Sequence, residues 1–115
     1  MKLLVTLSIA ASLAFASTSA FAGGISSGLP SNILVLPDNN LVFFSAGDHT
    51  GKPSCATNGT GTWAIDTSTG GGRAMYAAIL TALAIEKSIT VEGYGTGVCD
   101  RESSRESARF FYFSE

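Results

Sequence analysis

Histidine, cysteine and paired acidic residues carry much of enzyme chemistry, and this chain has few of them. His49 is its single histidine, and it follows Asp48 directly. A general base and the carboxylate that orients it approach each other from opposed directions, which adjacent residues seldom allow. No serine stands in a nucleophile motif. We therefore expect that the protein is not an enzyme.

Sites for a metal or a cofactor are not indicated either. One histidine and two cysteines fall short of any zinc spacing, and a calcium-loop spacing is absent. Gly70–Gly72 stands between a predicted strand and a predicted helix, where free amides can hold an anion, but the Walker lysine and its spacing are missing. Ordinary helix initiation after a capping Ser or Thr is the preferred interpretation. We expect no metal and no cofactor, and an anion site at these glycines stays open.

The two cysteines, Cys55 and Cys99, are predicted to form one disulfide. Two cysteines in a small exported domain are most simply a bridge, and only one intrachain pairing exists. A reactive thiol pair is the alternative, but the Cys-x-x-Cys spacing and a nearby basic cluster are missing.

Residues 1–22 have the three-part pattern of a signal peptide. Lys2 precedes an apolar run from Leu3 to Ala16, and Ala20-Phe21-Ala22 matches the motif that signal peptidase cleaves. The apolar run is shorter than the roughly 20 residues that cross a bilayer. We expect a mature domain of residues 23–115, secreted or periplasmic, with no membrane span.

Charge argues against nucleic acid as a partner. Without the predicted leader, which holds one of the seven Lys and Arg residues, six cations remain against nine acidic residues, a net charge of −3. Binding to a polyanion needs clustered Lys and Arg. The local concentration of arginine, residues 101–106, alternates with Glu and is typical of a solvated loop.

The mature chain is predicted to be mainly β with one helix. Branched and aromatic runs between turn signals indicate five strands, and apolar residues Met75, Ile79, Ala82 and Leu83 recur at helical spacing. The predicted elements, in order, are strands 32–36, 41–44 and 62–66, a helix from about 71 to 85, and strands 88–94 and 108–113. This βββαββ order fits a small five-stranded barrel of the oligonucleotide/oligosaccharide-binding (OB) type, and a helix on an open sheet is the alternative.

Adjacent aromatic residues predict a contact between subunits. Phe43-Phe44 and Phe110-Phe111 each place large apolar side chains on both faces of a strand. A small barrel buries one face, so either the helix or a second subunit must cover the other. We expect a homo-oligomer that associates through these residues.

Several segments together resemble a known group of proteins. They are Pro53-Ser54-Cys55, a strand ending at Asp66, Gly72-Arg73-Ala74-Met75-Tyr76, Lys87–Gly93, Gly97-Val98-Cys99 and the final aromatic strand. This layout resembles small secreted bacterial proteins and is in turn similar to the B subunits of subtilase-cytotoxin-type AB5 toxins. The resemblance implies ring-shaped homopentamers that bind cell-surface glycans, with a toxic A subunit as a further partner. It carries no sugar-contacting motif onto positions of this chain.

Sugar recognition needs an exposed aromatic side chain on which a sugar ring can stack, with short polar side chains on loops beside it. Trp63 and Tyr94 are the aromatic candidates, and Asp48 and His49 lie in a loop whose Lys52, Asn58 and Thr60 add hydrogen-bonding groups. A core position is the alternative for Trp63. We expect an exported, non-catalytic binding module that recognises glycans on a cell surface. The alternative is a periplasmic or secreted structural or inhibitory protein that binds another protein and has no sugar site.

Overall fold

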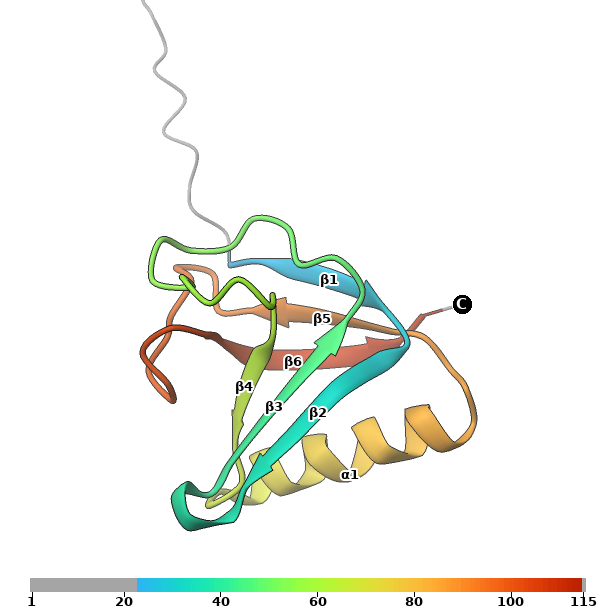
Figure 1. Cartoon of the computed structure of the whole chain (residues 1–115). Helices are drawn as coiled ribbons and strands as arrows, with labels where there is room; N and C mark the ends of the chain where they lie inside the picture. The colour runs from blue at the N-terminus through green and yellow to red at the C-terminus, as the bar shows by residue number, and fades with distance from the viewer. Residues whose placement is uncertain (1–22, 115) are drawn as a thin grey trace, which may run out of the picture.

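The computed structural model describes residues 23–114, so the predicted leader lies outside the described part. Six strands form one curled sheet in the order β1-β5-β6-β4-β3-β2, and one helix packs against it (Figure 1). The elements are β1 (Ile25–Gly28), β2 (Pro30–Leu36), the short 3-10 turn η1 (Pro37–Asn39), β3 (Leu41–Ala46), β4 (Trp63–Asp66), α1 (Gly70–Ala84), β5 (Ile89–Gly93) and β6 (Glu106–Phe113). The predicted class, mainly β with one helix, is confirmed.

The two outer strands of the sheet, β1 and β2, are consecutive in the chain and separated only by Leu29. β1 pairs with β5 and β2 pairs with β3, so the sheet curls until its two ends meet at this bend. Gly47 makes the close approach possible, because it has a φ of 70° and a Cβ there would overlap the carbonyl oxygen of Ser27. The prediction of five strands was wrong. The segment before Asn32, in which no strand was predicted, supplies β1 and the start of β2.

The remaining pairings join β2 to β3, β3 to β4, β4 to β6 and β6 to β5. β2 and β3 form a hairpin, with Leu36 opposite Leu41. β3 continues antiparallel to β4, and β4 lies parallel to β6, with Trp63 opposite Glu106. A parallel pair needs a long crossover, which here contains α1 and β5.

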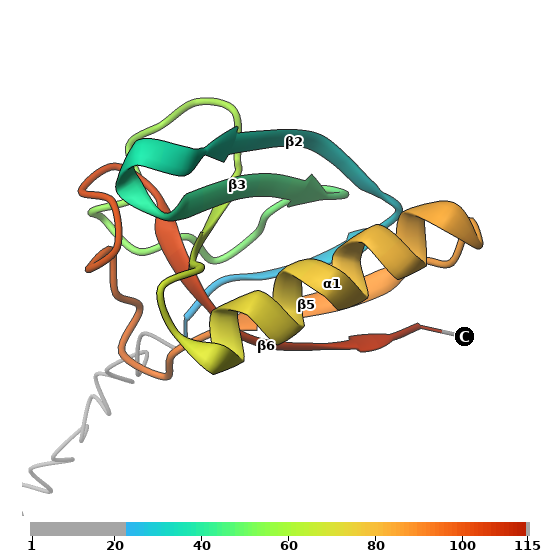
Figure 2. The same cartoon turned by 90° about the horizontal axis from the view of Figure 1, so that it is seen from below.

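Helix α1 closes one end of the curled sheet, between the β2–β3 layer and the β5–β6 layer (Figure 2). Thr69 caps it as predicted, because its Oγ1 accepts a hydrogen bond from the Gly72 amide at 3.0 Å. Ile79 and Ala82 are fully buried, and Met75 packs against the core. Leu83 differs from the prediction, since it is 45% exposed.

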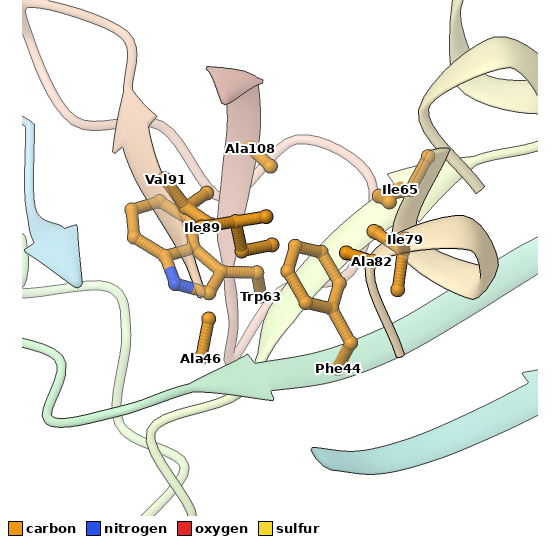
Figure 3. Close-up of a cluster of buried hydrophobic side chains, with 9 residues drawn as sticks. All are labelled: Phe44, Ala46, Trp63, Ile65, Ile79, Ala82, Ile89, Val91 and Ala108. Atoms are coloured by element: carbon orange, nitrogen blue, oxygen red, sulfur yellow. The ribbon is translucent and has the colours of Figure 1, made fainter. Parts of the chain in front are cut away.

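The core lies between the helix and the concave face of the sheet (Figure 3). Phe44 and Trp63 are its largest side chains and are fully buried among aliphatic residues from β5, β6 and α1. Phe43 points to the opposite face, yet only 4% of it is exposed, because the Arg105 guanidinium lies 4.0 Å from the centre of its ring. Both aromatic residues of β3 are therefore covered within one chain. The prediction that Phe43 and Phe44 form a contact between subunits was wrong.

The predicted disulfide is confirmed. Cys55 and Cys99 are bonded, with their Cα atoms 6.1 Å apart. The bridge fastens the long β3–β4 loop to the segment that follows β5. A second tie is the Asn58 amide, which donates to the Ser104 carbonyl at 3.0 Å. Within residues 23–114, no helix is long and apolar enough to span a membrane.

Candidate functional site

His49 belongs to a buried pair rather than to an open site. Its Nε2 lies 2.7 Å from Oε1 of Glu106, and only 1% of the His49 side chain and none of the Glu106 side chain is exposed. Nδ1 lies 3.1 Å from the carbonyl oxygen of Gly61, which can only accept a hydrogen bond. Both ring nitrogens are therefore held by protein groups. His49 is not placed to take a proton from a substrate.

Trp63 forms the floor beneath this pair. The His49 ring stacks on it, with centroids 3.9 Å apart and 15° between the planes. The indole Nε1 donates to Ser26 Oγ at 2.8 Å. Because Trp63 is fully buried and His49 nearly so, neither can present a platform to a sugar. The core alternative is correct for Trp63. His49 lines a hollow in the β3–β4 loop, but its ring is turned into the protein against Trp63.

Glu106 is the residue that sequence reasoning missed. Both of its carboxylate oxygens accept the Gly24 amide, at 2.7 and 3.1 Å, in addition to the contact with His49. The mixed charges of residues 101–106 suggested a solvated loop. The strand alternation could have indicated its burial. Glu106 lies two residues before Ala108 in β6, so both side chains point to the same, buried face.

Two adjoining hollows lie on the surface near this buried pair. One, of about 340 Å³, lies in the β3–β4 loop and is lined by Asp48, Lys52 and Thr60 among others. The other, of about 400 Å³, lies between β2 and the start of β6. The side chains that line the second hollow are Asn32, Ile33, Leu34, Phe43, Thr60, Thr62 and Arg105. Because Thr60 lines both hollows, we call the combined region the Thr60 surface.

A chain of hydrogen bonds fixes the polar groups of the Thr60 surface. Thr60 donates its amide to Asn58 Oδ1 at 3.0 Å, and its hydroxyl also bonds that oxygen. Its Oγ1 lies 3.0 Å from Thr62 Oγ1, which accepts from Arg105 Nε at 2.7 Å. Arg105 Nη1 in turn donates to Glu102 at 3.1 Å. Hydroxyl and guanidinium groups are thus oriented before any ligand arrives, which lowers the entropic cost of binding.

Glu102 predicts a pH dependence of stability. The Ser104 hydroxyl, which donates to the carboxylate, and then Arg105 lower the pKa of Glu102 below its ordinary value of 4.5. A lowered pKa in the folded state means that ionised Glu102 stabilises the protein above pH 4.5, and that this contribution disappears as pH falls through the folded-state pKa. We expect Glu102→Gln to lower the urea midpoint at pH 7 and to match the wild type near pH 2. An equal deficit at both values would contradict this account.

Tyr94 lies elsewhere. It is 38% exposed and lines a third hollow, of about 160 Å³, together with Gly71, Arg101 and Arg109. This hollow shares no lining residue with the Thr60 surface. The structure therefore brings Asp48, Lys52 and Thr60 together, as the loop prediction required, but places Tyr94 at the start of the helix.

An exposed apolar strip runs over the outer face of β1, β5 and β6. The strand register places Ile25 and Phe110 on either side of Glu92, and it sets Tyr112 in the next row on the same face. Ile25 and Tyr112 are exposed, and 41% of Phe110 is. We call Phe110 and Tyr112, together with the aliphatic Ile25 beside them, the aromatic strip. Phe111 has the opposite orientation and packs against the core, so its predicted place in a subunit contact was wrong.

No family model, curated protein or solved structure matches this chain. Among residues 23–114, His, Cys, Asp and Glu side chains form no group of three that could hold a metal ion.

Proposed function

We propose that the protein is an exported, non-catalytic binding module that recognises glycans through the Thr60 surface. The observation that carries this proposal is the fixed chain from Asn58 through Thr60 and Thr62 to Arg105. Sugar hydroxyls both donate and accept, so they pair well with a row of hydroxyl, amide and guanidinium groups. Exposed Leu34, at the rim of the same hollow, offers an apolar contact for the C–H face of a sugar ring.

Export is supported by two independent features. Residues 1–22 have the pattern of a cleaved leader. The Cys55–Cys99 disulfide requires an oxidising compartment to persist. Together they favour secretion or the periplasm.

Assembly into a homo-oligomer completes the proposal. Single-site affinity for a sugar is weak, and several copies that engage one surface raise the overall affinity by orders of magnitude. The aromatic strip offers an apolar contact for a neighbouring copy, and head-to-tail contacts close by rotation into rings. A ring of this kind, with an A subunit as a further partner, is what the resemblance to AB5 toxin B subunits suggests.

A glycan array probed with the processed protein tests recognition. We expect saturable binding to a limited set of glycans, and Arg105→Ala should weaken it about 10- to 100-fold because a charged hydrogen-bond donor is lost. Arg109→Ala, in the separate hollow beside Tyr94, is the matched control and should leave binding unchanged. A folded oligomer that binds no glycan would favour the alternative of a structural or inhibitory protein that binds another protein.

Light scattering of the processed protein tests assembly. The wild type should have several times the mass of one chain, and Phe110→Asp should shift it toward monomer because it places a charge in an apolar contact. Leu83→Asp, on the helix and similarly exposed, should leave the assembly intact. A wild type that is strictly monomeric at micromolar concentration would contradict the proposed oligomer.

A further inference from the structure

We propose that Glu106 is the receptor for the α-ammonium group of the processed chain. Removal of residues 1–22 would then complete a buried ionic network that joins the new N-terminus at Gly23 to His49. This inference rests on the cleavage after Ala22 that the proposed function includes, and it is independent of what the Thr60 surface binds.

The backbone of Gly23 and Gly24 lies directly against the carboxylate. A Cβ placed on Gly23 would stand 2.8 Å from Glu106 Oε2 and would overlap the carbonyl oxygen of Tyr94. Since a backbone nitrogen lies about 2.5 Å from the Cβ position of its own residue, the Gly23 nitrogen is at most about 5.3 Å from that oxygen. A small adjustment of a terminal residue therefore brings an ammonium group into contact with the carboxylate.

Gly24 holds this end of the chain in position. Its amide donates to both oxygens of Glu106, and a Cβ on Gly24 would overlap Glu106 Oε1. Side chains are thus excluded at both positions, and the backbone itself fills the space beside the carboxylate. This accounts for two consecutive glycines directly after the predicted cleavage site.

The buried position of the Glu106 carboxylate also favours a cation beside it. The side chain is fully buried, and a buried carboxylate is costly unless opposite charge and hydrogen bonds compensate it. Within the described part of the chain, His49 is the single basic side chain within 4 Å of the carboxylate. The surrounding groups from β4 and β5 are Trp63 and Gly93, which carry no charge. While Ala22 is still attached, Gly23 offers a neutral peptide nitrogen. After cleavage it offers a positive charge.

A comparison of chain starts tests the proposal. Protein that begins at Gly23, verified by mass spectrometry, is compared with protein that carries an N-terminal acetyl group on Gly23. We expect acetylation to lower the melting temperature by about 4–8 °C, as the loss of about 1 kcal/mol does in a domain of this size. In a Glu106→Gln background the same acetylation should change the melting temperature by less than 2 °C. Equal shifts in both backgrounds, or no shift in the wild type, would overturn the proposal.

Amine reactivity provides a second readout that needs no substitution. The α-amino group of the native protein should react with an acylating reagent at least tenfold more slowly than that of the urea-unfolded protein. Lys52 and Lys87, which are exposed, are internal controls and should react at nearly the same rate in both states. An α-amino group as reactive in the native as in the unfolded protein would also overturn the proposal. Neither experiment depends on a glycan, so failure here is distinct from failure of the proposed binding function.

Discussion

Replacing Glu106 by alanine should lower the free energy of unfolding by about 3–5 kcal/mol, the largest loss that we expect from one substitution. The change leaves the Gly24 amide without its acceptor and removes the partner of His49 Nε2 inside the protein. It also leaves an empty space beside Gly93. This glycine lies so close to Glu106 that a Cβ on Gly93 would overlap the carboxylate. Urea denaturation followed by tryptophan fluorescence measures the loss, since Trp63 stacks on His49.

Glu92→Ala is the control for this substitution. Glu92 lies on β5 and pairs with Phe110 of β6, the strand that also contains Glu106. Glu92 is only partly buried. Its replacement should change the free energy of unfolding by no more than about 0.5 kcal/mol. If Glu106→Ala lowers the free energy of unfolding by less than about 1 kcal/mol, the pair of Glu106 and His49 does not hold the start of β1 in place.

Replacing both cysteines by serine should lower the free energy of unfolding by about 2–4 kcal/mol. The bridge joins residues 44 positions apart, and its loss lets the unfolded chain explore more conformations. In the native state the β3–β4 loop would keep its tie at Asn58 to Ser104 but lose its covalent one. We expect the amides of residues 50–60 to exchange faster with solvent, a result that hydrogen-exchange mass spectrometry detects.

The double replacement avoids an unpaired thiol, and wild type treated with reductant is its control. Both should show the same lower urea midpoint. Equal midpoints for oxidised and reduced protein would contradict a stabilising bridge. A lower midpoint with unchanged loop exchange would show that Asn58 alone holds the loop.

Local signals predicted the framework of the fold well. Thr69 and the spacing of Ile79 and Ala82 located the helix, because capping and periodicity act within a few residues. The disulfide followed from the number of cysteines and from the leader pattern of residues 1–22, which indicates export to an oxidising compartment. The bend between β1 and β2 was missed, because it depends on a contact with a residue distant in the sequence. Gly47, which directly follows β3, lies against the carbonyl oxygen of Ser27 and leaves no room for a Cβ.

The site was less predictable because long-range contacts build it. Asp48, Lys52 and Thr60 were recognised as polar loop residues, but Arg105 joins them from a segment more than 40 residues away. The same arginine covers Phe43, which the sequence alone suggested was free for a subunit contact. Glu106 is buried because Gly24 and His49, which are distant in the sequence, bond its carboxylate. The alternating charges of residues 101–106 instead predicted that Glu106 lies in a solvated loop.

The amide NMR spectrum of the processed protein, titrated with the glycan that gives the strongest array signal, tests the central claim most directly. The proposed function predicts saturable shifts confined to the Thr60 surface, in the amides of residues 59–62 and Asn32 and in the Arg105 side chain. Saturable shifts centred instead on Tyr94 and Gly71, or a spectrum that no glycan changes, would contradict it.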